Sequence, residues 1–152
     1  MGLGSGAPFQ TGCRVTGVAA TITTGTLTYL PFVNTPEDWD TDEMHSTTVN
    51  TGRITCKTPG KYLCVFACEF GATATKIFQL MITLNAGRTI IASNHCEPYT
   101  TAGSTFPNQV VTIIDLIAND YIEACVYHNV GANAQVNYAV RHSPVFMAQR
   151  IG

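Results

Sequence analysis

The chain has 152 residues, of which 45% are apolar and 12% are charged, and this length suits one domain with one hydrophobic core. Its net charge of −2 argues against the basic surface that binds nucleic acids, so we expect no nucleic-acid partner. The chain has no apolar run near the ~20 residues of a membrane span and no secretory-signal pattern at its start, so we expect no membrane association.

The low charge predicts association between copies of the chain. An ordinary domain carries about 25% charged residues, about twice the fraction found here. Threonine, with 22 residues, supplies much of the polar surface instead. Such a surface loses little hydration free energy when it is buried against a second copy, so we expect an obligate oligomer.

The first residues predict an arm rather than a part of the core. Residues 1–12 are rich in glycine and carry no charge, which indicates a flexible N-terminal arm ahead of a single domain at residues 13–152. Two interpretations of the arm stay open. It is either a cloning remnant or a segment that becomes ordered when it docks on a neighbouring subunit.

Beyond the arm, the pattern predicts an all-β fold. Short runs rich in Val, Ile, Thr, Tyr and Phe alternate with clusters of Gly, Pro and Asn, and no long stretch has helical periodicity. The predicted strands, in chain order, are Cys13–Val18, Thr26–Phe32, Gly52–Cys56, Gly60–Phe70, Lys76–Leu84, Arg88–Ser93, Gln109–Leu116, Tyr121–His128, Ala134–Val140 and Val145–Ile151.

Several predicted strands are apolar on both faces. In the strand that contains Tyr62 and Phe66, these rings project to one face, while Leu63 and Val65 project to the other. The same alternation recurs in the strand that begins at Gln109. One face of such a strand fills the core of a sandwich, and we expect a symmetry-related copy to cover the other.

The six cysteines are spread singly along the chain, without the C-x-x-C spacing of a zinc site. We expect most of them to be buried free thiols, with one or two disulfides between strands as the alternative. Cys64 and Cys68 lie about 13 Å apart along one predicted strand, too far to pair with each other. A catalytic cysteine is not expected.

A stretch around Tyr62 resembles the globular C1q family, whose signature is an aromatic residue followed by the pattern G-x-Y-x-F-x-[FY]. Gly60, Tyr62 and Phe66 match this signature. Cys64 replaces a Phe of the signature, and Ile54 stands where its first aromatic residue would be.

Two further stretches follow the family's order of landmarks. Leu116–Ile122 is similar to the family pattern L-x-x-G-D-x-[VI], with Asn119 in place of Gly. Asn is tolerated there because it is the commonest non-Gly residue at positive φ. Residues 146–151 resemble the terminal strand that returns beside the first, so the resemblance extends over almost the whole domain.

The resemblance implies a ten-stranded jelly-roll β-sandwich of the tumour necrosis factor (TNF) type, which assembles as a trimer about an aromatic-rich axis. The aromatic residues then have two interpretations, plain core or threefold interface, and we expect some of them in each place. The residues expected at the trimer interface are Tyr62, Phe66, Phe70, Tyr121 and Tyr127.

The segment Trp39–Ser46 is similar to that of small stand-alone C1q-like structural proteins of tailed phages. This resemblance implies a virion protein on the capsid surface, assembled in the host cytoplasm, whose homotrimer binds the major capsid protein or another virion component as a decoration or cement protein. The alternative is a fibre-tip or receptor-binding module of the same fold that recognises the host surface. The arm residues expected to contact the capsid are Met1, Leu3, Pro8, Phe9 and Gln10.

The remaining polar clusters predict no chemistry. Asp38, Asp40 and Asp42 alternate, but the spacing of an EF-hand loop is absent. We favour a loop whose carboxylates accept hydrogen bonds from nearby backbone amides, with a bound cation as the alternative. The four histidines are scattered and no nucleophile motif occurs, so we expect no metal, no cofactor and no enzyme activity.

Loops at the ends of a jelly roll are the expected place for partner recognition. The long loop predicted at residues 94–108 either contacts a partner or packs on its own trimer. The residues expected to contact a partner are Trp39, Asp40, Asp42, His45, Tyr99 and Phe106.

Overall fold

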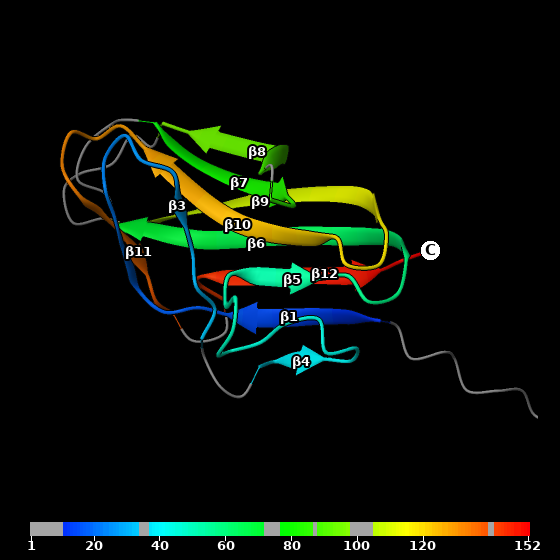
Figure 1. Cartoon of the computed structure of the whole chain (residues 1–152). Coiled ribbons are helices and arrows are strands. Elements are labelled where there is room, and N and C mark those ends of the chain that lie inside the picture. The colour runs from blue at the N-terminus through cyan, green and yellow to red at the C-terminus, as the bar shows by residue number, and fades with distance from the viewer. Residues whose placement is uncertain (1–10, 34–36, 72–76, 87, 98–104, 140–141) are drawn as a thin grey trace, which may run out of the picture.

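The computed structural model describes residues 11–33, 37–71, 77–86, 88–97, 105–139 and 142–152. These residues form two antiparallel sheets that pack as the two layers of a sandwich (Figure 1). They contain no helix of any kind, and so none that is long and apolar enough to cross a membrane. The predicted all-β sandwich is therefore confirmed.

The first sheet has the strand order β2–β11–β6–β12–β1–β4, and β9 pairs with the other edge of β6. The first strand of the chain, β1, lies beside the last, β12 (Figure 1). The strands of this sheet are β1 (Gly12–Thr16), β2 (Ala20–Ile22), β4 (Trp39–Asp40), β6 (Gly60–Gly71), β9 (Thr105–Leu116), β11 (Ala134–Asn137) and β12 (Val145–Arg150).

The second sheet has the strand order β3–β10–β7–β8, and β5 also pairs with β10. A register shift between Ile82 and Thr83 interrupts the pairing of β7 with β8. The strands of this sheet are β3 (Thr28–Tyr29), β5 (Arg53–Thr55), β7 (Phe78–Leu84), β8 (Thr89–Cys96) and β10 (Tyr121–His128).

Every one of the ten predicted ranges overlaps a strand of the structure. The short strands β2 and β4 add to the predicted set within the described residues. The largest difference in boundary is at β9, which begins at Thr105 rather than at Gln109. Strand β1 begins at Gly12, so the domain starts one residue earlier than predicted.

The arm predicted at residues 1–12 falls mostly outside the structure. Residues 1–10 lie outside the described residues, and with them the five expected capsid contacts. Thr11 and Gly12 belong to the sandwich, because the Thr11 carbonyl accepts a hydrogen bond from the Arg150 backbone and the Gly12 N–H donates to Thr41 Oγ1. The capsid-contact prediction therefore stays a prediction for Met1, Leu3, Pro8, Phe9 and Gln10.

The core lies between the two sheets and is rich in phenylalanine. Phe146 is 5.5 Å from Phe32 and 6.2 Å from Phe66 between ring centroids. A second cluster joins Phe70 and Phe78, whose centroids are 4.9 Å apart. Such ring pairs contribute about 0.5–1.5 kcal/mol beyond the area that they bury.

Phe106 belongs to this core, which corrects its predicted role. The residue lies in β9 and its side chain is buried, with its ring centroid 5.4 Å from that of Phe70 and 4.9 Å from that of Phe78. The prediction that Phe106 contacts a partner from a loop is wrong, because the strand extends through this position and turns the ring inward.

The backbone geometry at two turns accounts for Asn119 and Gly60, two residues of the family patterns. Asn119 has φ 73°, the left-handed conformation for which Asn was expected to replace Gly, and its N–H donates to the Cys56 carbonyl at 2.9 Å. Gly60 begins β6, where a Cβ atom would lie 2.3 Å from the Gly152 carbonyl oxygen. Only glycine fits there, since the C-terminal residues pass directly over the backbone.

Candidate functional site

The outer face of the first sheet carries apolar side chains from three adjacent strands that are exposed or half-buried in the single chain. Val111 is 50% exposed and Ile113 is 58% exposed, and the other members are half-buried. We name this set the apolar sheet face, and its members are Leu63 and Val65 of β6, Val111 and Ile113 of β9, and Met147 of β12.

The register makes the apolar sheet face continuous. Leu63 pairs with Ile113, and Val65 pairs with Val111 on one side and with Met147 on the other. Residues directly opposite in an antiparallel pair point to the same face, with Cβ atoms about 4.5–5.5 Å apart. The five side chains therefore touch or nearly touch their neighbours across the strands.

Charged groups lie around this face: Arg14 of β1, directly opposite Met147, forms an ion pair with Asp38 at its side, and two further pairs lie toward its ends. Lys61 Nζ is 3.3 Å from Asp115 Oδ1 at one end, and Glu69 Oε1 is 3.1 Å from His142 Nε2 toward the other. A continuous apolar surface bordered by polar groups is the usual mark of an interaction surface on a water-soluble domain. The arrangement supports packing against another apolar surface.

Three of the five aromatic residues expected at the trimer interface lie in the core instead. Tyr62, Phe66 and Phe70 are 0% exposed, because they occupy the face of β6 that points toward the second sheet. The Tyr62 hydroxyl donates to the Thr58 carbonyl at 2.6 Å, and burial raises the pKa of this phenol. Another copy of the chain cannot reach these rings, so this part of the interface prediction is wrong.

The other two aromatic residues lie on the outer side of the second sheet. Tyr121 and Tyr127 are half-buried and alternate along β10 with the inward-facing residues of that strand. The guanidinium carbon of Arg53 lies 4.0 Å from the centroid of the Tyr121 ring, in cation–π geometry. The five predicted residues thus occupy two layers, and they do not form one surface.

No protein-family model matches the chain, and no curated protein matches it. Solved structures do match it. The globular domain of zebrafish complement 1qA protein has a TM-score of 0.60 at 15% identity, covering 93% of this chain and 98% of that chain. The Eiger TNF from S. frugiperda has a TM-score of 0.60 at 15% identity, covering 94% of this chain and 93% of that chain.

The chain has the C1q/TNF jelly-roll fold. The likeness covers almost the whole chain, and at 15% identity it concerns the fold alone. This likeness agrees with the predicted jelly roll. The apolar sheet face therefore lies on one of the two sheets of that jelly roll.

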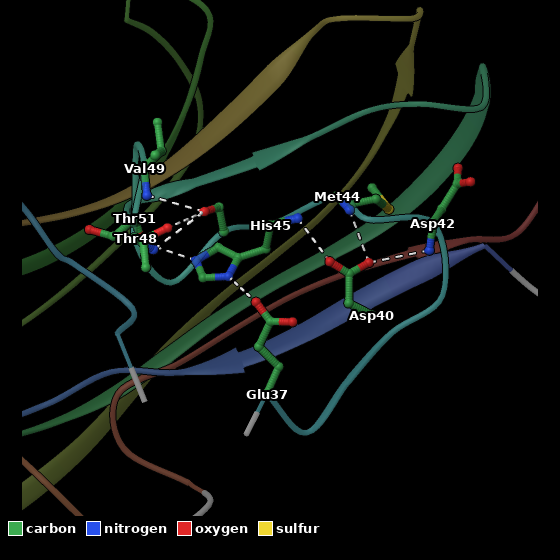
Figure 2. A network of polar contacts seen from close by, with 9 residues as sticks. Glu37, Asp40, Asp42, Met44, His45, Thr48, Val49 and Thr51 are labelled. Atoms are coloured by element: carbon green, nitrogen blue, oxygen red, sulfur yellow. Dashed lines mark hydrogen bonds and ion pairs between the residues drawn. The ribbon is translucent and has the colours of Figure 1, made fainter. Parts of the chain in front are cut away.

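In this jelly roll, Asp40 organises the loop that follows β4 (Figure 2). Its carboxylate oxygens accept hydrogen bonds from the backbone N–H groups of Asp42, Met44 and His45, at 3.3, 3.0 and 2.9 Å. The Asp42 carboxylate accepts a hydrogen bond from the Thr58 hydroxyl at 2.9 Å. The acidic segment therefore has the structure of a loop fixed by its own carboxylates, the interpretation that the sequence favoured.

The buried side chain of His45 also holds this loop in place (Figure 2). Its side chain is fully buried, and its ring hydrogen-bonds to the Glu37 carboxylate and to the Thr51 carbonyl. Trp39 is half-buried in β4. Tyr99, expected in a second partner-contacting loop, lies outside the described residues. Within the described ranges, no three His, Cys, Asp or Glu side chains lie close enough together to hold a metal ion.

All six cysteines are free thiols, as most were expected to be. Burial raises the pKa of the Cys64 and Cys125 thiols to about 12, and it also raises the pKa of Cys13 and Cys68. A thiol with such a pKa is protonated near neutral pH and is a poor nucleophile. Cys96, at the end of β8, is the one thiol that is half-buried rather than buried.

We expect a thiol-specific aromatic disulfide reagent near pH 8 to modify about one thiol per folded chain. Cys96 is the expected site, because the other five thiols are buried. Absorbance of the released chromophore, followed by peptide mass spectrometry, measures this number and locates the modified residue. A Cys96→Ser variant should lose the native-state reaction, and unfolding in guanidinium chloride should release the remaining thiols. Rapid modification of several thiols in the folded protein would contradict the buried positions.

Proposed function

We propose that this chain is a non-enzymatic structural protein that works as a homotrimer. The observation that carries the proposal is the apolar sheet face, where Val111 and Ile113 are at least half exposed in the isolated chain. Complete burial of one Val or Ile side chain contributes about 1.5–3 kcal/mol. Three copies related by a threefold axis can each cover the apolar sheet face of a neighbour in a closed assembly.

The polar groups that the sequence singled out support a structural role. Asp40 and His45 use their side chains to hold their own loop, and five of the six thiols are buried. Conversely, the outer face of the first sheet carries the apolar and unreactive side chains of Val111 and Ile113, which are at least half exposed. The proposal therefore rests on surface contact between subunits and assigns no reaction to the chain.

For the biological setting, the proposal is a decoration protein on a virus capsid. Support comes from the resemblance of Trp39–Ser46 to C1q-like phage structural proteins and from the match between a trimer and the threefold or quasi-threefold positions of a capsid lattice. Each trimer would bridge neighbouring copies of the major capsid protein. Weak contacts of this kind stabilise a particle because they are repeated over many linked copies.

Copy number in purified virus particles tests this setting. The expected result is a number of chains comparable to that of the major capsid protein, with trimeric density at threefold positions in electron cryomicroscopy. A few copies at a tail or vertex would contradict decoration and would favour the host-recognition module. Particles without the chain would contradict both virion roles while leaving the trimer to be tested on the purified protein.

A further inference from the structure

A pocket of about 380 Å³ lies beside the apolar sheet face, toward the end of the sandwich where β6 finishes. Its walls come from three strands and from the segment before β12, so the fold brings together groups that are far apart in sequence. The lining groups that matter here are Ala67 and Glu69 of β6, Asn94 of β8, Pro107 and Gln109 of β9, and His142.

The frame of the pocket is fixed by hydrogen bonds between the strands. The Glu69 N–H donates to Ser143 Oγ at 2.8 Å, on the side of β6 away from β9. Pro107, opposite Glu69 in the edge strand β9, therefore loses no ladder bond through its missing N–H. Asn94 joins β8 to β9, because its Nδ2 donates to the Gln109 carbonyl at 2.7 Å.

Three residues of this frame, Asn94, Gln109 and Glu69, have side-chain donors or acceptors that make no hydrogen bond within the described part of the chain. Both amide hydrogens of Asn94 are used, on the Gln109 carbonyl and on Asn108 Oδ1, so its own side-chain oxygen remains an acceptor. The Gln109 side chain makes no hydrogen bond with the described part of the chain, and it offers a carbonyl and an NH₂ group. Glu69 uses one carboxylate oxygen on His142 and has a second.

The charges of the lining groups indicate which class of ligand the pocket binds. Among the described residues that line the pocket there is no Lys or Arg, and the imidazole of His142 already faces the Glu69 carboxylate. Acceptor oxygens without an opposing cation disfavour a phosphate or a carboxylate. A polar rim disfavours an apolar ligand, whereas hydroxyl groups can donate to the free acceptors and accept from the Gln109 amide.

We propose that this pocket binds a neutral saccharide through Glu69, Asn94 and Gln109. Its volume falls in the range of small-molecule sites, about 300–1,000 Å³. Ala67 and Pro107 provide apolar surface beside the polar groups, and a sugar ring presents both kinds of surface. All lining groups come from one chain, so the site goes beyond the proposed trimer and does not require it.

Saturation-transfer NMR on the full chain tests the site, with four probes: the methyl α-glycosides of glucose, galactose and mannose, and N-acetylglucosamine. At least one probe should bind with a millimolar dissociation constant. Gln109→Ala should weaken this binding about fivefold, the effect of losing one hydrogen bond. This variant removes no hydrogen bond within the described protein, so we expect its fold to be retained.

Matched control variants distinguish sugar binding in this pocket from nonspecific binding to the protein. Gln135→Ala removes an amide of β11 that donates to Thr21 Oγ1 and does not line the pocket, and it should leave binding unchanged. Glu69→Gln keeps an acceptor of the same shape and should bind more weakly than the unmodified protein. Absence of saturation transfer for all four probes, or equal binding by the Gln109→Ala variant, would overturn the proposal. Competition by inorganic phosphate would overturn the neutral class of ligand.

Discussion

A Val111→Asp variant is expected to sediment as a single chain of 16.3 kDa, whereas the unmodified protein sediments at about three times that mass. Val111 is a half-exposed member of the apolar sheet face, opposite Val65 of β6 and two residues from Ile113 along β9. A carboxylate buried there without a partner costs several kcal/mol. We expect the dissociation constant of the trimer to rise at least ~100-fold, which is about 2.7 kcal/mol.

Two further variants make this result specific. Val49→Asp places the same charge on a valine that is 65% exposed but lies in the segment before β5, and it should leave the trimer intact. Val111→Thr keeps the branched shape that suits a strand and should weaken association less than aspartate does. If the unmodified protein sediments as a monomer at micromolar concentration, the homotrimer proposal fails whatever the variants do.

Phe66→Ala is expected to lower the free energy of unfolding by about 3–5 kcal/mol. Phe66 is fully buried within one chain and packs edge-on against Phe146, so the substitution leaves a cavity between the sheets. For a domain of this size, such a loss lowers the melting temperature by roughly 10 °C or more. Chemical denaturation and thermal melting measure the two quantities.

The same variant separates a core role for Phe66 from the predicted interface role. A core residue should change stability, while the folded chains keep their sedimentation behaviour at low temperature. Phe66→Leu conserves most of the volume and should cost less than about 1.5 kcal/mol. A Phe66→Ala protein that melts like the unmodified protein but dissociates would show that the ring lies between subunits and that its buried position is wrong.

The strands could be predicted because their apolar residues alternate and their turns contain Gly, Pro and Asn. Asn119 is the clearest example, since its positive φ follows from its place in the family pattern. The start of β9 could not be predicted from local signals, because Pro107 usually marks a loop. Only the pairing of this residue with Glu69, 38 positions earlier in the chain, shows why proline is tolerated in the strand.

For the strands that are apolar on both sides, the sequence does not predict which side points into the core. Alternation separates Tyr62 and Phe66 from Leu63 and Val65, but it does not say which set faces the core. The structure places the larger rings inside, where they fill the space between the sheets, and leaves the smaller aliphatic side chains outside. Residue volume is the signal that could have favoured this choice.

The saccharide pocket could not have been found from the sequence. Glu69, Asn94, Gln109 and His142 follow no common motif, and each alone has the character of an ordinary polar surface residue. They meet because β6 pairs with β9 and because Asn94 of β8 reaches the edge of β9. This proximity depends on strand order and register, which local sequence patterns do not encode.

Because β1 pairs with β12, the two ends of the sandwich are not equivalent. Thr11 and Arg150 are hydrogen-bonded neighbours, so the chain enters and leaves the sandwich at the same end (Figure 1). The Glu69 region of β6 lies at the opposite end, since β6 begins beside Gly152 and runs away from it. A group joined to the sandwich directly at Thr11 or at Arg150 would therefore sit at this end and leave the opposite tip unobstructed.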